Sequence, residues 1–125
     1  MARNLILCID DDPDLLHLHT IVLERAGYSV VAASAATQAM EVFREKPVDL
    51  VITDHILPGR SGSELIAEMK RMKPTVPIIM LSGLPEAPEG EQHADVFVEK
   101  IGGTQALLRT VASTLTRYKQ PDKTQ

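Results

Sequence analysis

Short apolar runs alternate along this chain with longer segments in which apolar residues recur every three or four positions. The short runs show no regular alternation of apolar and polar residues, which is typical of parallel strands covered on both faces. The longer segments have the spacing of amphipathic helices. The expected strands are residues 5–9, 28–32, 50–53, 77–81 and 96–98, and the expected helices lie around residues 15–23, 36–43, 65–72 and 107–118.

Local signals mark several element ends. Asp12 stands before a proline that suits a first helical position, so it is predicted to cap the first helix. Gly27 is predicted to end that helix. Residues 57–62 are rich in turn formers and are predicted to form a loop. Ser61 and Glu64 have the spacing of a capping box at the start of the third helix.

The order of these elements, strand then helix in repetition, predicts an α/β fold. Its sheet is expected to be parallel and covered by helices on both faces. In such folds, ligands bind outside the carboxyl ends of the strands. The residues that follow each strand are therefore the first candidates for a functional site.

Charged and hydroxyl side chains follow most of the expected strands. Asp10 and Asp11 follow the first, Asp54 the third, Ser82 the fourth, and Lys100 comes shortly after the fifth. Since the carboxyl ends of parallel strands share one edge, these groups are expected to lie close together. Carboxylates that close repel one another unless a cation offsets their charge. Mg²⁺ suits a site with few carboxylates and several waters.

Each of these residues also has an ordinary structural interpretation. An acid after a strand is often a helix N-cap, which is the favoured interpretation for Asp12. One cap needs only one acid, so this explanation does not extend to Asp10 and Asp11. Asp54 alone could solvate a loop, and the hydroxyl and the lysine could belong to an ordinary turn and surface. The joint occurrence of these residue types at strand ends favours a functional site.

Composition and charge limit the class of protein. The chain has 125 residues, 44% of them hydrophobic, which suits one folded domain and is too little for two of ordinary size. Its 13 Lys and Arg against 17 Asp and Glu give a net charge of −4, which argues against nonspecific nucleic-acid binding. Cys8 is the lone cysteine, so no intramolecular disulfide can form. The run at 5–9 is too short for a signal peptide or a membrane span, so we expect a cytoplasmic protein.

Nearly the whole chain, from about residue 5 to residue 118, resembles the receiver domain of two-component response regulators, in particular single-domain, chemotaxis-regulator-like receivers. The resemblance rests on ILCIDDDP at 6–13, DLVITDHILPG at 49–59, PIIMLSG at 77–83 and ADVFVEK at 94–100. It implies a flavodoxin-like, doubly wound (βα)5 fold with five parallel strands in the order 2-1-3-4-5. It also implies a receiver domain at 1–118 and a polar tail at 119–125.

The resemblance implies a phosphoacceptor and its metal ligands. Asp54 would accept a phosphoryl group from a phosphohistidine on a sensor histidine kinase or a histidine phosphotransfer protein. Asp11 would bind Mg²⁺ or Mn²⁺ directly and Asp10 mainly through water. Asp54 and the backbone carbonyl of Ile56 would complete the protein ligands. Such a protein catalyses its own phosphorylation and is not an enzyme in the usual sense.

The remaining implied roles concern the response to phosphorylation. Lys100 would pair with the phosphoryl oxygens, and Ser82 would hydrogen-bond to the phosphoryl group. Phe97 would be the switch aromatic residue, although it could also be an ordinary core residue. The output would pass to a downstream protein through the face made by the fourth helix, the fifth strand and the fifth helix. Phosphorylation could drive dimerisation there, and no direct binding to DNA or membrane is expected.

Three features depart from the family pattern. Ile101 follows Lys100 where the family usually has a proline after a cis peptide bond, and a non-proline cis bond would cost about 2.5–4 kcal/mol. Residues 85–91 hold two prolines and a glycine, so the fourth helix is expected to be short, irregular or absent. Ile56 and Leu84 stand where the family has residues that flank the hydrolytic water. We therefore expect slow self-dephosphorylation.

Three other functions stay open on the sequence alone. A phosphohydrolase with an aspartyl-phosphate intermediate usually needs a second acid two residues after the nucleophile, where this chain has Ile56. A flavodoxin-like cofactor module needs a loop rich in Gly, Ser or Thr after the first strand, where this chain has three aspartates. A degenerate receiver would bind a partner without phosphorylation, although this chain has every residue type of the acceptor site.

Overall fold

The computed structural model describes residues 3–54, 56–57, 60–82, 95–99 and 103–118. Its centre is a five-stranded parallel sheet in the order β2-β1-β3-β6-β7. Counted along the chain, this is the order 2-1-3-4-5, so the predicted doubly wound α/β fold is confirmed. The strands are β1 (Leu5–Ile9), β2 (Ser29–Ala33), β3 (Leu50–Asp54), β6 (Ile78–Ser82) and β7 (Val96–Glu99).

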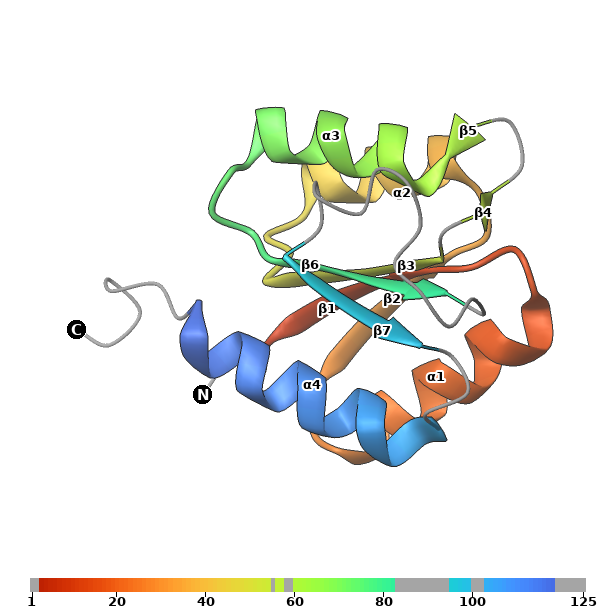
Figure 1. Ribbon diagram of the computed structural model, residues 1–125, viewed down its shortest axis with the longest axis vertical. Helices are drawn as coiled ribbons and strands as arrows, with labels where there is room; N and C mark the ends of the chain where they lie inside the picture. Colours follow the sequence, from red (N-terminus) through yellow and green to blue (C-terminus); the bar gives the residue numbers. More distant parts are fainter. Residues whose placement is uncertain (1–2, 55, 58–59, 83–94, 100–102, 119–125) are drawn as a thin grey trace.

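Helices cover both faces of this sheet and give a three-layered molecule (Figure 1). Helices α1 and α4 lie on one face, and α2 and α3 lie on the other. Their bounds are α1 (Pro13–Arg25), α2 (Ala36–Glu45), α3 (Gly62–Met72) and α4 (Gly103–Arg117). Among the residues that the structure describes, no helix is both long and apolar enough to cross a bilayer. The predicted short or irregular fourth helix falls on residues 83–94, outside the described residues.

The core has one cluster of buried side chains on each face of the sheet. Leu7 and Ile9 of β1 join the cluster beneath α2 and α3, whereas Ile6 and Cys8 join the cluster beneath α1 and α4. Consecutive residues of a strand point to opposite faces, which accounts for this division. Every residue of β3 is buried. The double coverage explains why the strands show no polar alternation.

Helix α1 begins and ends where the local signals predict. Oδ1 of Asp12 accepts hydrogen bonds from the backbone N–H groups of Asp14 and Leu15, at 3.0 and 3.4 Å. Pro13 is the first helical residue, a position whose N–H has no partner within the helix. Gly27 follows the C-cap residue with a φ of 102°, which strongly favours glycine.

The loop expected at residues 57–62 is in part a hairpin, so that prediction was wrong. β4 (Ile56–Leu57) pairs antiparallel with β5 (Arg60–Ser61). Strands of two residues are too short to show a period, so the sequence pattern carried no signal for them. Helix α3 begins at Gly62, directly after Ser61, and the contacts of the predicted capping box stay untested.

The second strand is also shifted by one residue from its prediction. It begins at Ser29 and ends at Ala33. The N–H of Tyr28 donates to the carbonyl oxygen of Leu23 at 3.2 Å, so this residue still belongs to the end of α1. The apolar ring of this residue suits a helix end and a strand start equally, so the sequence pattern could not assign it to one of them.

Two acidic side chains fix the starts of strands at the amino edge of the sheet. Oδ2 of Asp49 accepts a hydrogen bond from the N–H of Leu5 at 2.8 Å. Oδ2 of Asp95 accepts one from the N–H of Ile78 at 2.7 Å and forms an ion pair with Nζ of Lys70 at 2.6 Å. These contacts help to hold the strands in register, and the register positions the residues at the opposite, carboxyl edge.

Candidate metal centre

The register of the two central strands brings Asp10 and Asp54 to the same level. Ile9 of β1 pairs with Thr53 of β3, and each aspartate is the next residue along its strand direction. The N–H of Asp10 donates to the carbonyl oxygen of Ala33 at 3.1 Å, which extends the ladder with β2 by one step. The prediction that acids after different strands meet at one edge is therefore confirmed for this pair.

Asp11 completes a cluster of three carboxylates. One carboxylate oxygen from each of Asp10, Asp11 and Asp54 lies within 4.8 Å of the others. Asp10 and Asp54 are buried, with only 2% and 9% of their surface exposed, whereas Asp11 is exposed. Oδ1 of Asp10 accepts a hydrogen bond from the N–H of Asp12 at 2.9 Å, which orients this carboxylate.

The donor set of this cluster fits a hard divalent cation. All three side chains offer oxygen, which is the ligand that Mg²⁺ and Ca²⁺ prefer. Ligand oxygens around one Mg²⁺ stand about 3–4 Å apart, because each lies about 2.0–2.1 Å from the ion. The carboxylates therefore need only small movements to share one ion. The exposed side of the cluster, at Asp11, is open to the waters that Mg²⁺ usually keeps.

The surroundings beneath the cluster are buried and uncharged. Burial, and to a lesser degree the charge of Asp10, raises the pKa of the Cys8 thiol from 9.0 to about 12. This thiol therefore stays neutral at ordinary pH. The buried hydroxyl of Thr53 donates to the backbone carbonyl oxygen of Asp54 at 3.1 Å. Sequence reasoning did not single out Thr53, although a polar residue just before Asp54 in an apolar strand was a visible signal.

The other predicted site residues are placed only by their backbone or not at all. Ser82 is the last residue of β6, one step beyond Leu81, which pairs with Asp54. Its backbone therefore reaches the same edge as the cluster. Phe97 lies on β7, paired with Met80.

Four further predictions about this site are not tested by the residues that the structure describes. Ile56 begins β4, two residues after Asp54, and its predicted role as a carbonyl ligand is not tested. Lys100 follows Glu99, the last residue of β7, and lies outside the described residues. The predicted cis or trans state of the bond to Ile101 and the role of Leu84 also fall outside them.

Comparison with protein families gives one match over most of the chain. The family model of the response regulator receiver domain matches residues 6–112. This range includes the five strands of the sheet except for Leu5 of β1, together with the carboxylate cluster and most of α4.

Solved structures of the same kind resemble this fold closely. A CheY-like response regulator receiver domain protein from Methanospirillum hungatei JF-1 has a TM-score of 0.88 and 25% identity, over 94% of this chain and 98% of that one. The response regulator protein TrrA from Thermotoga maritima, solved in complex with Mg(2+)-BeF, has a TM-score of 0.83 and 29% identity. That match covers 88% of this chain and 97% of TrrA.

A curated relative is longer than this chain. The phosphate regulon transcriptional regulatory protein PhoB of Pseudomonas aeruginosa is 33% identical over 123 residues, which cover 94% of this chain and 54% of PhoB. Across three such relatives, the chain spans between 26% and 54% of their length.

Proposed function

This chain belongs to the response regulator receiver domain family, and from that premise we propose that Asp54 accepts a phosphoryl group in two-component signalling. The observation that carries the proposal is the cluster of Asp10, Asp11 and Asp54, whose carboxylate oxygens lie within 4.8 Å of one another. A nucleophilic carboxylate beside two further acids suits metal-assisted phosphoryl transfer.

The proposed reaction transfers the phosphoryl group from a phosphohistidine to Asp54. A carboxylate oxygen of Asp54 forms a new bond to phosphorus while the phosphorus–nitrogen bond to the donor imidazole breaks. The imidazole nitrogen keeps the electron pair of the broken bond and takes up a proton. Asp54 is buried at the end of β3, so its position is fixed by the sheet before the donor arrives.

A divalent cation is the proposed cofactor, Mg²⁺ in the first place and Mn²⁺ as a substitute. Asp10, Asp11, Asp54 and the backbone carbonyl of Ile56 would hold it, and it would offset negative charge on the phosphoryl oxygens. The complex of TrrA with Mg(2+)-BeF supports this assignment. We further propose that Lys100 pairs with the phosphoryl oxygens and that Ser82 hydrogen-bonds to the phosphoryl group.

Receiver domains generally partner with histidine kinases. We propose a sensor histidine kinase or a histidine phosphotransfer protein as the donor for this chain, in the cytoplasm. The chain acts as a phosphoacceptor with slow self-dephosphorylation and turns over no external substrate. Its readout is proposed to pass from Ser82 and Phe97 to the surface of a domain at 1–118, and from there to a downstream protein without direct contact to DNA.

Phosphorylation by a small-molecule donor tests the proposed function. Incubation with acetyl phosphate and Mg²⁺ should add about 80 Da to the intact mass of the protein. The gain should disappear in Asp54→Asn and in the presence of a chelator. Asp12→Asn is the matched control, because it removes a nearby acid outside the cluster and should leave the gain intact. No gain in the wild type would favour a degenerate receiver that binds its partner without phosphorylation.

A further inference from the structure

Strand β2 forms one edge of the sheet, with β1 on its inner side. The N–H of Ser29 and the carbonyl oxygen of Ala33 bond to the β1 side, at 3.0 and 3.1 Å. Because backbone groups alternate in direction along a strand, those of Val30 and Ala32 point to the open edge. Within the described part of the chain, the structure shows no hydrogen bond to these outward groups.

Both ends of this open stretch are closed by the chain itself. At one end, the N–H of Tyr28 donates to the carbonyl oxygen of Leu23 at 3.2 Å. At the other, the N–H of Ser34 donates to Oε1 of Gln38 at 3.1 Å. The outward N–H groups on either side of Val30 and Ala32 are therefore already bonded within the chain, which places the open donors at these two residues.

The edge lacks the charges and prolines that often prevent strand pairing. No charged residue and no proline occur between residues 26 and 40, a stretch that includes all of β2. Exposed edges of natural sheets usually carry lysines, prolines or bulges that block a second strand. An uncharged edge of small and β-branched residues is compatible with a further strand.

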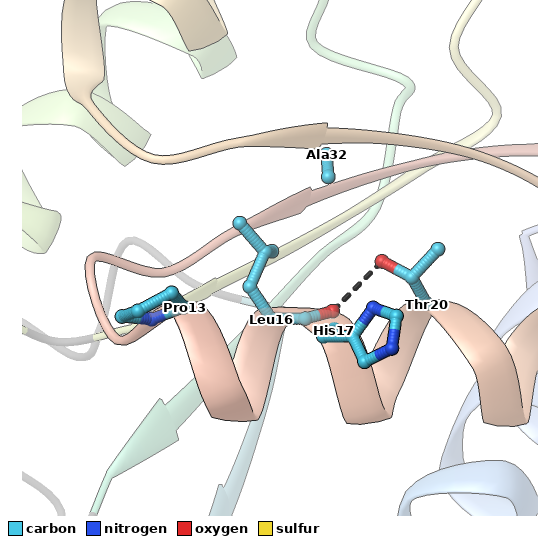
Figure 2. A pocket seen from close by; sticks show the side chains of 5 residues that line it. All are labelled: Pro13, Leu16, His17, Thr20 and Ala32. Atoms are coloured by element: carbon cyan, nitrogen blue, oxygen red, sulfur yellow. Dashed lines mark hydrogen bonds between the residues drawn. The ribbon is translucent and has the colours of Figure 1, made fainter.

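An apolar groove lies directly beside this edge. It has a volume of about 280 Å³ and is lined by Pro13, Leu16, His17, Thr20 and Ala32 (Figure 2). The hydroxyl of Thr20 donates to the carbonyl oxygen of Leu16 at 2.8 Å, so it is not offered to the groove. Ala32 is exposed, and its small side chain leaves the space between β2 and α1 open.

We propose that this edge pairs antiparallel with the same edge of a second copy of the chain. A two-fold axis passes between the Val31 residues of the two copies. Val30 of each copy then stands opposite Ala32 of the other copy. Both residues direct N–H and carbonyl groups outward, so each pair exchanges two hydrogen bonds. The edge is thus complementary to itself in this one register.

This register brings an apolar side chain of the second copy next to the groove. Directly opposed residues of antiparallel strands have Cβ atoms about 5 Å apart. Val30 of the second copy, which packs in part against its own core, therefore meets the exposed Ala32 beside the groove. A different partner strand would need to match both the edge and the groove, whereas a second copy supplies both in one symmetric contact.

The two α1 helices would lie on the same face of the joined sheet and run in opposite directions. The contact is small compared with stable dimer interfaces, so the association should be weak. We expect it in the micromolar to millimolar range of concentration.

Sedimentation equilibrium over a concentration series without phosphodonor tests the proposal. The wild type should approach a dimer as its concentration rises to about 1 mM. Ala32→Lys places a charge at the edge and groove, and Ala32→Pro removes the outward N–H, so both should weaken the association at least tenfold. Leu18→Lys is the matched control, since Leu18 is an exposed apolar residue of α1 that does not line the groove. A wild type that stays monomeric, or an Ala32→Lys variant that dimerises equally well, overturns the proposal.

Cysteine cross-linking tests the register. In a Cys8→Ala background, Val31→Cys places the thiols of both copies on the two-fold axis, within the distance that a disulfide spans. Ser29→Cys puts them about 14 Å apart and should not cross-link. Equal cross-linking of the two variants, or none at Val31→Cys in a sample that dimerises, contradicts the antiparallel register.

Discussion

Three carboxylates share a small volume at the carboxyl edge of the sheet, and two of them are buried. Asp10 and Asp54 are 2% and 9% exposed, so water solvates their charges only in small part. The exposed Asp11 adds a third charge within 4.8 Å. Without a cation, the folded protein holds unfavourable electrostatic energy at this point. The proposed function therefore rests on residues that we expect to weaken the metal-free fold.

Removal of one of these charges should stabilise the metal-free protein. We expect Asp54→Asn to raise the free energy of unfolding in EDTA by about 1–3 kcal/mol, as measured by urea denaturation. Mg²⁺ should stabilise the wild type more than this variant. Glu41→Gln removes an exposed charge on α2 and should change stability by no more than about 0.5 kcal/mol. A lower urea midpoint for Asp54→Asn than for the wild type in EDTA speaks against this account.

The buried thiol beneath the cluster should be inert in the folded protein. Its pKa is raised from 9.0 to about 12 by burial and by Asp10. At pH 8, this shift alone lowers the thiolate population about a thousandfold, and the thiol is also shielded from reagents. We expect alkylation of Cys8 by iodoacetamide to be negligible in buffer and rapid in concentrated urea. Fast labelling of the native protein is the contrary result.

The phosphorylated protein should lose its phosphoryl group slowly. Ile56 and Leu84 cannot hydrogen-bond to a hydrolytic water through their side chains, if they take the positions implied by the family resemblance. Intact-mass spectra recorded after removal of the phosphodonor should show phosphoprotein for many minutes. Ile56→Asn should shorten this lifetime by about tenfold or more, because an amide can orient water. A wild-type lifetime of seconds in Mg²⁺ buffer contradicts the prediction.

At the scale of single residues, sequence reasoning found the residues whose chemistry stands out and missed residues whose role lies in their hydrogen bonds. Asp10, Asp11 and Asp54 were recognisable because several acids follow apolar strands. Asp95 was not, because its hydrogen bond to Ile78 depends on how neighbouring strands are placed. Thr53 was overlooked, although its hydroxyl bonds to the carbonyl of the very next residue. Asp12 was correctly predicted as the cap of the first helix, because a cap depends only on the neighbouring residues.

At the scale of elements, the start of α1 is coupled to the cluster. Asp12 caps the helix with Oδ1, and its own N–H donates to Oδ1 of Asp10 at 2.9 Å. The same turn therefore begins the helix and orients a carboxylate of the cluster. This short turn therefore lets consecutive acids serve two purposes, with Asp12 capping the helix and Asp10 and Asp11 belonging to the carboxylate cluster.

Loss of the cap should weaken the fold moderately. Asp12→Ala leaves the N–H groups of Asp14 and Leu15 without their partner, and we expect the free energy of unfolding to fall by about 1 kcal/mol. Asp12→Asn keeps a capping oxygen and should stay close to the wild type. Urea denaturation of the three proteins measures both effects. An equal loss of unfolding free energy in both variants would show that the charge of Asp12, and not its capping hydrogen bonds, stabilises the fold.

The predictability of each element follows its length and periodicity. Helices such as α2 bury a stripe of side chains at helical spacing, and the central strand β3 buries every residue. Both leave a clear pattern in the sequence. The hairpin of β4 and β5 has two residues in each strand and leaves none. The one-residue shift of β2 shows the same limit, since a pattern locates an element better than its ends.

At the scale of the whole molecule, the sheet offers two separate surfaces, one at the carboxyl ends of its strands and one along its edge strand β2. The carboxyl edge gathers the acids of β1 and β3 into the proposed phosphoacceptor site, and its arrangement follows from the strand order that the alternation of elements predicted. The open edge at β2 offers a surface for a second copy. Which surface delivers the output depends on side chains and partners that no periodic pattern encodes.

The most direct test of the central claim is to locate the phosphoryl group on the chain. After incubation with acetyl phosphate and Mg²⁺, borohydride converts an aspartyl phosphate to homoserine, and tandem mass spectrometry of the digest identifies its position. The account predicts homoserine at position 54 alone, with none in the presence of EDTA. Unmodified aspartate at position 54, together with homoserine elsewhere or nowhere, would contradict the assignment of Asp54 as the phosphoacceptor.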